Sequence, residues 1–527
     1  MTSKRRWHLL AGILLAALLG VMLATVLDYG MTADEPVQNR YGRRLVRWYT
    51  SLGADRAAVE QHDTFLYGGF FELAAQAARW VSPLGVYETR HVVNVLFGFG
   101  GFVAVLLLGE RLGGPLAGIL SVLFLALTPA YYGHAFNNPK DIPFAALYAL
   151  GTAVIVRASD RLPRLRAREV LLVGVVVGLA AGVRVAGLVL VPLAGALWLG
   201  LLWLRGGRRL RASDLVRPGL ALAGVLVLAW GVMVLFWPWA QLDPARNPFR
   251  AFAVFTRFWT SMPVLFDGQI VPSGQLPRTY IPSLFALTLP EFYLVAFLLG
   301  GLRLLGSGRE QPREPKRAER LLALTWLGAT VVGPVLAVVL NHTPLYNGHR
   351  HLLFVVPGLA ALAGVSAAAG LRGGIRRPVR VAGAVVLGLS LLVTLVDMVR
   401  LHPYQAMYFN RLVAGGLARA SQRYETDYWC TTYREGLDWI VDHYSRPDVT
   451  ERIRVAGHAT LTQVSYDLRR TKERRRRFRP TTIHGDPHLV LATTSGGDHR
   501  RTPGRVVHVV ERLGAPLLYV FEVKKPH

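Results

Sequence analysis

Two adjacent carboxylates, Asp34 and Glu35, follow the first long apolar run of the chain, AGILLAALLGVMLATVL. At the mouth of a membrane helix, a carboxylate that stays ionised can accept a proton from an attacking hydroxyl group. Because neighbouring side chains diverge, only one of the two can face the reacting group, and the other would orient it or cap a helix. The alternative is purely structural: the pair caps the next helix, in which Pro36 suits a first position.

A second polar group lies in the stretch GHAFNNPKDIPF, where Asn-Pro predicts a turn. Lys140 offers a point charge to an anion. Asn138 and Asp141 are candidates for contacting an acceptor or a metal, and Asp141 with Asp34 or Glu35 could hold a divalent cation through oxygen atoms. The alternative is a helix start in which Asp141 is the N-cap residue.

The third candidate is Arg350, which begins a late apolar run in LYNGHRHLLFVVPGLA. Flanked by His349 and His351, it could bind a phosphate near headgroup depth. A lone interfacial arginine otherwise extends its charge to the membrane surface. Two histidines two positions apart at a helix start do not share a face, so they do not predict a zinc site.

Two features near the C-terminus carry weaker signals. The run RRTKERRRRFR, residues 469–479, is either a solvated loop or a surface that attracts anionic headgroups or glycans. The single cysteine, Cys430, excludes an intrachain disulfide. Between Trp429 and Thr431, it is more typical of a small packed residue than of a nucleophile.

The elements that must position these residues are membrane helices, because 52% of the 527 residues are hydrophobic and long apolar runs recur. The net charge of +27 lies largely in short segments between these runs, so it sets the orientation in a membrane and does not indicate nucleic-acid binding. The sequence predicts about eleven membrane-spanning helices, near residues 8–27, 91–108, 114–132, 142–157, 170–183, 185–204, 219–238, 284–304, 321–340, 351–370 and 381–399.

The distribution of lysine and arginine predicts which side each loop faces. In the eleven-helix arrangement the basic segments share the cytoplasmic side: 4–6, 157–168, 205–211, 303–320 and 371–380. The opposite side then holds all the candidate site residues and the long loop 28–90. This loop contains amphipathic stretches such as FELAAQAARWV, which suit helices lying on the membrane face.

After about residue 400 the composition changes, and helical patterns alternate with short apolar runs. We therefore predict a membrane domain over residues 1–400 and a small α/β domain over residues 401–527, outside the cytoplasm. The segment VVHVVERLGAPLLYVFEV predicts a hairpin that turns at Gly514-Ala515-Pro516.

These elements, in this order and topology, resemble the GT-C glycosyltransferases. The match is closest to the branch of protein mannosyltransferases and aminoarabinose transferases, which use polyprenyl-phosphate sugars. The stretch YFNRLVAGGLARASQRYETDYWCTTYREGLDWI is similar to a segment after the last helix in many bacterial members. The resemblance implies a polytopic enzyme of the bacterial inner membrane that transfers a sugar, with inversion, from a polyprenyl-phosphate donor to an extracytoplasmic glycan, lipid or protein.

By position, the resemblance implies that Asp34 is the catalytic carboxylate, with Glu35 beside it. Lys140 and Arg350 match the basic residues that hold the lipid-linked phosphate. Asp141 matches a second-loop acid that contacts metal or acceptor in some members. A divalent metal ion is the one cofactor that these residues suggest.

Two other classes of function are compatible with the sequence. A transporter or flippase for a lipid-linked substrate is one, but transporters usually place charges near the bilayer midplane and contain repeats. Here the candidate charges gather at one face, and we find no internal repeat. A non-catalytic assembly subunit with an external domain is the other class.

Overall fold

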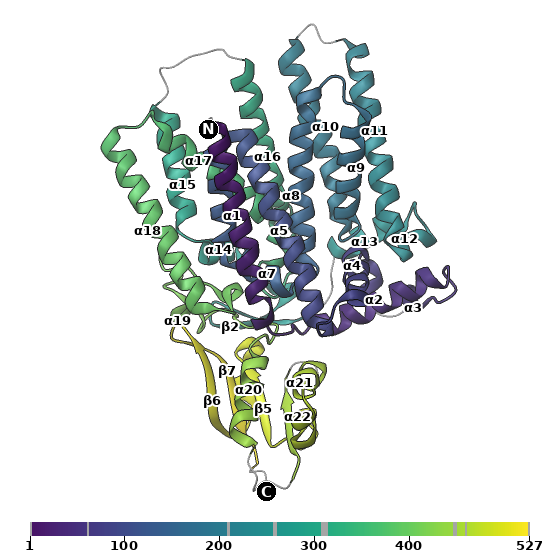
Figure 1. Ribbon diagram of the computed structural model, residues 1–527, viewed down its shortest axis with the longest axis vertical. Helices are drawn as coiled ribbons and strands as arrows, with labels where there is room; N and C mark the ends of the chain where they lie inside the picture. Colours follow the sequence, from purple (N-terminus) through teal and green to yellow (C-terminus); the bar gives the residue numbers. More distant parts are fainter. Residues whose placement is uncertain are drawn as a thin grey trace.

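The computed structural model describes residues 3–60, 63–207, 211–256, 261–306, 315–445, 451–458 and 461–524. A bundle of long helices adjoins a small sheet domain formed by the C-terminal part of the chain, and the N-terminus lies at the far end of the bundle (Figure 1). Parts of the basic segments 205–211 and 303–320 lie outside the described residues.

Eight helical segments of the described residues are long and apolar enough to cross a membrane, and two bent helix pairs raise the number to ten. The long helices are α1 (Ser3–Thr25), α5 (Val86–Gly113), α8 (Asp141–Ala158), α10 (Leu190–Gly206), α11 (Ala212–Leu235), α16 (Pro315–Asn341), α17 (Val356–Arg372) and α18 (Arg377–Leu401). The bent pairs are α6 (Pro115–Ala126) with α7 (Pro129–Asn137), and α14 (Tyr280–Thr288) with α15 (Phe292–Gly306). The chain is therefore a multi-pass membrane protein, as predicted.

The fifth predicted span, near residues 170–183, corresponds to α9 (Ala167–Ala181), which packs beside α8 and α11 within the bundle (Figure 1). Its 15 residues extend about 23 Å, so it is shorter than the eight spans counted above. It ends at Gly182, and the chain turns through Arg184 into a short 3-10 helix (Val185–Val189) before α10. Because only a few residues separate the two helical segments, the fifth and sixth apolar runs are nearly fused in the sequence.

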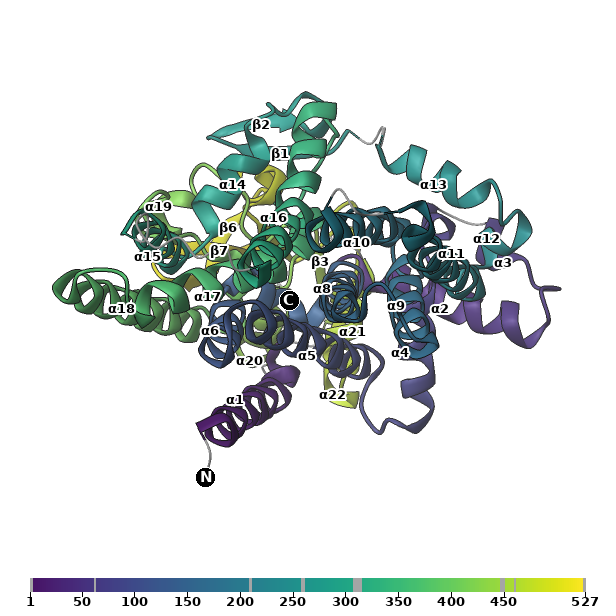
Figure 2. The ribbon, with the colours of Figure 1, turned by 90° about the horizontal axis from the view of Figure 1, so that it is seen from above.

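The bundle has a buried centre and lipid-facing outer helices. In the most apolar window of each span, 89% of the residues are buried for α8, but 17% for α1 and 11% for α18; Figure 2 shows α1 and α18 at the periphery. Small residues permit the close central contacts. A Cβ atom at Gly109 of α5 or at Gly364 of α17 would collide with Ser121 of α6.

Short helices lie on the end of the bundle that adjoins the C-terminal domain. In the stretch 28–90 these are α2 (Glu35–Thr50), α3 (Ala57–Glu60) and α4 (Phe70–Val81), and α2 and α3 run across the bundle end (Figure 1). Helix α4 buries Phe71 and exposes Trp80 and Val81, an arrangement that suits the membrane interface. Further along the chain, α12 (Pro238–Leu242), α13 (Asn247–Thr256) and the hairpin β1 (Pro263–Phe266) and β2 (Gln269–Pro272) follow α11.

The C-terminal part forms a five-stranded mixed sheet in the order β4-β3-β5-β7-β6. Its central strand β5 has the sequence LVLAT, apolar up to its last residue, and is buried throughout, whereas the edge strand β6 has a single buried residue. The strands are β3 (Ile453–Gly457), β4 (Phe478–Pro480), β5 (Leu489–Thr493), β6 (Arg505–Arg512) and β7 (Ala515–Glu522), and the helices are α19 (Leu417–Ala420), α20 (Tyr433–Tyr444), α21 (Leu461–Leu468), α22 (Lys472–Arg477) and α23 (Asp498–Arg501).

Two local features of this part refine the sequence analysis. The hairpin turns at Leu513-Gly514, both with positive φ, so the predicted turn at Gly514-Ala515-Pro516 is one residue late. The reason is that Ala515 already pairs with Arg512 as the first residue of β7. Cys430 is 7% exposed and packs in the core of this region, as expected for a small structural residue.

Candidate functional site

The two adjacent acids point to different surroundings. Glu35, the first residue of α2, is 1% exposed and accepts a hydrogen bond from the Thr32 backbone N–H at 2.9 Å. The Nε2 atom of His91, on α5, lies 3.2 Å from the Glu35 carboxylate. Asp34, at the N-cap position, is partly buried and makes no capping bond through its side chain. In the described part of the chain we find no hydrogen bond or ion pair to the Asp34 carboxylate.

Asp141 is the centre of a buried charge cluster, which we define as Asp141, Arg184 and Arg350. One carboxylate oxygen of Asp141 pairs with Arg184, and the other lies 3.2 Å from Nη1 of Arg350. Asn138 donates a further hydrogen bond to this carboxylate at 2.9 Å and accepts one from the Asp141 backbone N–H at 3.0 Å. The turn predicted from Asn-Pro therefore holds the acid at the start of α8.

Arg350 connects this cluster to the C-terminal part of the chain. Its side chain is 5% exposed, and its guanidinium carbon lies 4.8 Å from the ring centre of Trp429 and 5.4 Å from that of Tyr346. Arg350 is thus held between aromatic rings and the Asp141 carboxylate. It does not extend to the membrane surface, so the snorkelling interpretation does not fit the structure.

Lys140 lies between Asp34 and the cluster. Its Nζ atom is 4.5 Å from the ring centre of Tyr67, and the guanidinium of Arg184 approaches the same ring at 5.8 Å. Burial lowers the pKa of Lys140, the nearby Asp34 carboxylate opposes this effect, and Arg350 and Arg184 reinforce it. Asp34, Lys140 and the two arginines therefore share one electrostatic environment.

The two histidines beside Arg350 have separate surroundings. His349 packs on Phe285 with ring centres 5.0 Å apart, and burial lowers its pKa to about 4. It is therefore uncharged at neutral pH and does not join the cationic group. The ring of His351 lies 5.2 Å from that of Tyr346, and its buried Nδ1 atom has no hydrogen-bond partner in the structure as described.

A cavity of about 410 Å³ opens beside the charge cluster. Its lining is mainly apolar and comes from α8, α10, α13, α16 and the segment 343–354. Tyr67, Arg184, Tyr346 and His351 also line it, and these are side chains that contact the cluster or one another. The cavity thus joins an apolar space to a group of cationic and aromatic side chains.

No model of a known protein family matches the chain, and no curated protein matches it. Among solved structures, the chain is similar to ArnT from Cupriavidus metallidurans bound to undecaprenyl phosphate, with 16% identity, 98% of each chain covered and a TM-score of 0.51. ArnT in the apo state gives 16% identity, the same coverage and a TM-score of 0.50. An oligosaccharyltransferase, AglB from Archaeoglobus fulgidus, is 12% identical, and the match covers 94% of this chain and 70% of AglB with a TM-score of 0.48.

The chain has the GT-C fold. The similarity extends over nearly the whole chain, so it includes the C-terminal sheet part as well as the helical bundle. The fold predicted from the sequence resemblance is confirmed.

Within this GT-C fold, the structure adds residues that the sequence analysis did not single out. Arg184 pairs with Asp141 and lines the cavity, Trp429 covers Arg350, and His91 approaches Glu35. A signal for Arg184 was present, because it is a charged residue between two apolar runs and such residues are functional candidates by default. Nothing local marks His91, whereas Trp429 lies in the stretch ETDYWCTTYREGLDWI that carries part of the resemblance. Both reach the site from distant parts of the chain.

The donor atoms of this site do not suit the divalent cation that we considered. Arginines bind both carboxylate oxygens of Asp141, so this acid has no oxygen left to offer a cation. Of Asp141 and Asp34, only Asp34 has no ion pair within the part of the chain that the structure describes. Over the described ranges, no three His, Cys, Asp or Glu side chains are grouped closely enough to hold a metal ion. The described residues therefore do not fit a divalent cation at this site.

Proposed function

We propose that this protein is a membrane glycosyltransferase that moves a sugar from a polyprenyl-phosphate donor to an acceptor outside the cytoplasm. One observation carries the proposal: an apolar cavity of about 410 Å³ meets a cationic cluster near Asp34, whose carboxylate has no hydrogen bond or ion pair among the described residues. An isoprenoid chain suits the apolar lining, and its phosphate suits Arg184. The likeness to a chain crystallised with undecaprenyl phosphate supports this choice of donor.

In this proposal the cations stabilise the leaving phosphate. Arg184 lines the cavity, and the Nζ atom of Lys140 lies near the ring of Tyr67, another lining residue, so we expect the phosphate to bind next to Tyr67 and near both cations. Negative charge grows on the phosphate oxygen as its bond to the sugar breaks, and fixed cations stabilise that charge. Arg350 is enclosed by Asp141 and Trp429, and we assign it to positioning Arg184 through their shared carboxylate.

Asp34 is proposed as the general base. Its carboxylate lies near Lys140 and is free to receive a proton from the acceptor hydroxyl. The acceptor oxygen attacks the anomeric carbon, the bond from that carbon to the phosphate oxygen breaks, and the configuration inverts. Glu35 fixes the start of α2 through Thr32 and His91, and so orients its neighbour.

The proposed location is the bacterial inner membrane, with the N-terminus in the cytoplasm and the site on the outer side. The N-terminal end and the C-terminal domain lie at opposite ends of the bundle, which supports this orientation (Figure 1). We keep the division into a membrane domain, residues 1–400, and an external domain, residues 401–527. Trp429 of the second part contacts Arg350 of the first, so both parts contribute to the site.

A donor screen tests the function. The purified full-length protein in detergent is incubated with radiolabelled polyprenyl-phosphate sugars, and release of the sugar-free carrier lipid is measured. We expect release with at least one sugar and its loss in Asp34→Asn. If no donor of this class loses its sugar, or if the variant releases it at the parental rate, the proposal is wrong.

A further inference from the structure

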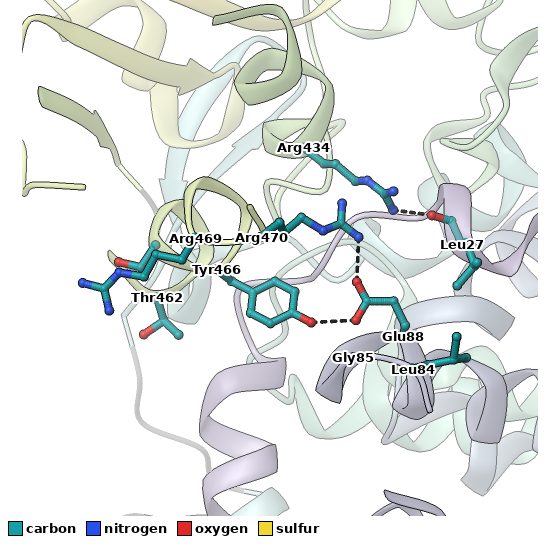
Figure 3. A pocket seen from close by; sticks show the side chains of 10 residues that line it. Leu27, Leu84, Gly85, Glu88, Arg434, Thr462, Tyr466, Arg469 and Arg470 are labelled. Carbon is teal, nitrogen blue, oxygen red and sulfur yellow. Dashed lines mark hydrogen bonds and ion pairs between the residues drawn. The ribbon is translucent and has the colours of Figure 1, made fainter. Parts of the chain in front are cut away.

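A second pocket, of about 700 Å³, lies between the C-terminal domain and the ends of two membrane helices (Figure 3). One wall is formed by Leu27 after α1 and by Leu84, Gly85 and Glu88 around the start of α5. The opposite wall comes from α20 and α21. It shares no lining residue with the cavity beside Arg184, so it is a separate space.

The charge of this pocket is predominantly positive. Arg434, Arg469 and Arg470 line it, against the single carboxylate of Glu88. That carboxylate is occupied: it accepts a hydrogen bond from the Tyr466 hydroxyl at 2.6 Å and pairs with Nη2 of Arg470 at 2.7 Å. Glu88 and Arg470 neutralise each other, and two cationic groups remain.

The two remaining cationic groups are Arg434 and Arg469, and although they are differently placed, each guanidinium can donate hydrogen bonds to a ligand. Arg434 donates to the backbone carbonyl groups of Leu27 and Tyr29, contacts that fix its side chain, and the nearby Asp467 offsets only part of its charge because it also interacts with Arg470. Arg469 is exposed, is directed away from Glu88 (Figure 3), and has no side-chain bond among the residues described. Thr462 and Ser465, on α21 shortly before Arg469, add hydroxyl groups. Guanidinium and hydroxyl donors together suit a phosphate.

The pocket lies at the end of the first membrane span, and this level indicates that a phosphate would reach it as part of a lipid headgroup. Leu27 is 43% exposed and immediately precedes Asp28, where the first membrane span ends. Earlier in α1, Val21 and Leu23 are 53% and 41% exposed. An acyl chain can therefore lie along α1 while its headgroup sits at the level of the pocket.

We propose that this pocket binds the phosphate headgroup of an anionic phospholipid in the leaflet next to the C-terminal domain. The bound headgroup would join α1 to α21 across the gap between membrane and domain. On α21, Gln463 donates to the carbonyl groups of Met31 and Trp429, which flank the candidate site. The lipid would thus support the position of both segments, and this inference does not depend on the reaction that the site performs.

The test is a lipid titration of the full-length protein, followed by native mass spectrometry, with phosphatidylglycerol and phosphatidylcholine as probes. We expect one saturable phosphatidylglycerol whose binding weakens about fivefold in Arg469→Ala, the ratio that corresponds to about 1 kcal/mol per basic residue near an anionic surface. Arg476→Ala, an exposed arginine outside the pocket, is the matched control and should bind as the parent does. Glu88→Gln should bind more tightly, because the pocket then loses its one lining carboxylate and Arg470 keeps only its longer pair with Asp467 at 3.6 Å.

Three outcomes would overturn the proposal. Equal binding of phosphatidylcholine would show that charge is not recognised. Equal weakening in the Arg469 and Arg476 variants would show general attraction to a basic surface. Displacement of the lipid by an excess of inorganic phosphate, with phosphate alone protecting the protein equally well against heat, would show a site for a free anion.

Discussion

The charge cluster at Asp141 and the basic helix α22 contain similar side chains in opposite surroundings. In the cluster, the side chains of Asp141, Arg184 and Arg350 are 2%, 16% and 5% exposed, and each has a partner. Helix α22, with the sequence KERRRR, has no buried residue. One of its arginines, Arg474, pairs with Asp438 at 2.8 Å at a partly exposed position. Burial and pairing, more than the number of charges, separate a candidate site from a solvated surface.

The comparison predicts that breaking a buried ion pair and breaking an exposed one change the stability of the folded protein by different amounts. An exposed ion pair contributes little, because water and salt screen it. A buried pair is costly to break, because the remaining charge is left without solvent or partner. The predictions below test this difference, beginning with the largest expected effect.

Asp141→Asn should cause the greatest loss of stability. The substitution keeps the side-chain volume but leaves two buried arginines facing a neutral group, at a cost of about 3–5 kcal/mol. Thermal unfolding in detergent measures the change. Asp486→Asn is the control, since that exposed carboxylate pairs with Arg454 and Lys524 on the surface and its loss should not be measurable. Equal shifts of Tm in the two variants would contradict the distinction.

Arg184→Ala should weaken donor binding about 10- to 100-fold, since a charge-assisted hydrogen bond contributes about 1.5–3 kcal/mol. Arg184→Lys should recover only part of this affinity, because lysine lacks the planar fork of donors. Arg476→Ala, in the exposed run, is the matched control and should bind as the parent does. Binding of a polyprenyl phosphate to the purified variants measures the effect. If Arg184→Ala also binds normally, the phosphate site lies elsewhere.

Glu425 extends the comparison to a buried acid of the C-terminal region. Burial raises its pKa to about 7, while hydrogen bonds from the Leu265 backbone and Ser495 act in the opposite direction. A carboxyl group whose pKa rises on folding stabilises the folded state while protonated. This contribution is complete below about pH 4.5 and is lost as the pH rises through about 7.

We therefore expect the free energy of unfolding to fall by on the order of 3 kcal/mol across that pH window, since one pH unit corresponds to about 1.4 kcal/mol. Glu425→Gln should remove this part of the pH dependence. The measurement is Tm against pH for the parent and the variant. Curves of identical slope would show that Glu425 titrates normally.

Much of the fold could be predicted from the sequence, because apolar runs of sufficient length have few alternatives to a membrane helix. The break near Gly182 was also predictable, since α9 ends there and a new helical segment begins at Val185. The hairpin was predictable too, although its turn was placed one residue late. At that turn, local backbone geometry decides which residues leave the strands.

The candidate site could be predicted only in part. Asp34, Lys140, Asp141 and Arg350 do come together, since their loops share one end of the bundle. Arg184 could have been added, as a charge between apolar runs. The neutral state of His349 depends on burial against Phe285, a contact between distant segments that no local pattern contains.

The most direct measurement compares Asp34→Asn with Glu35→Gln in initial transfer rate and in donor binding. Asp34→Asn cannot accept a proton, so we predict a loss of about 10²–10⁴-fold in rate with donor affinity unchanged. Glu35→Gln keeps an oxygen acceptor for Thr32 and should lose about tenfold or less, as for a hydrogen bond worth about 1 kcal/mol. Equal small losses in the two variants would contradict the assignment of Asp34 as the base, and would return the pair to a structural role at the start of α2.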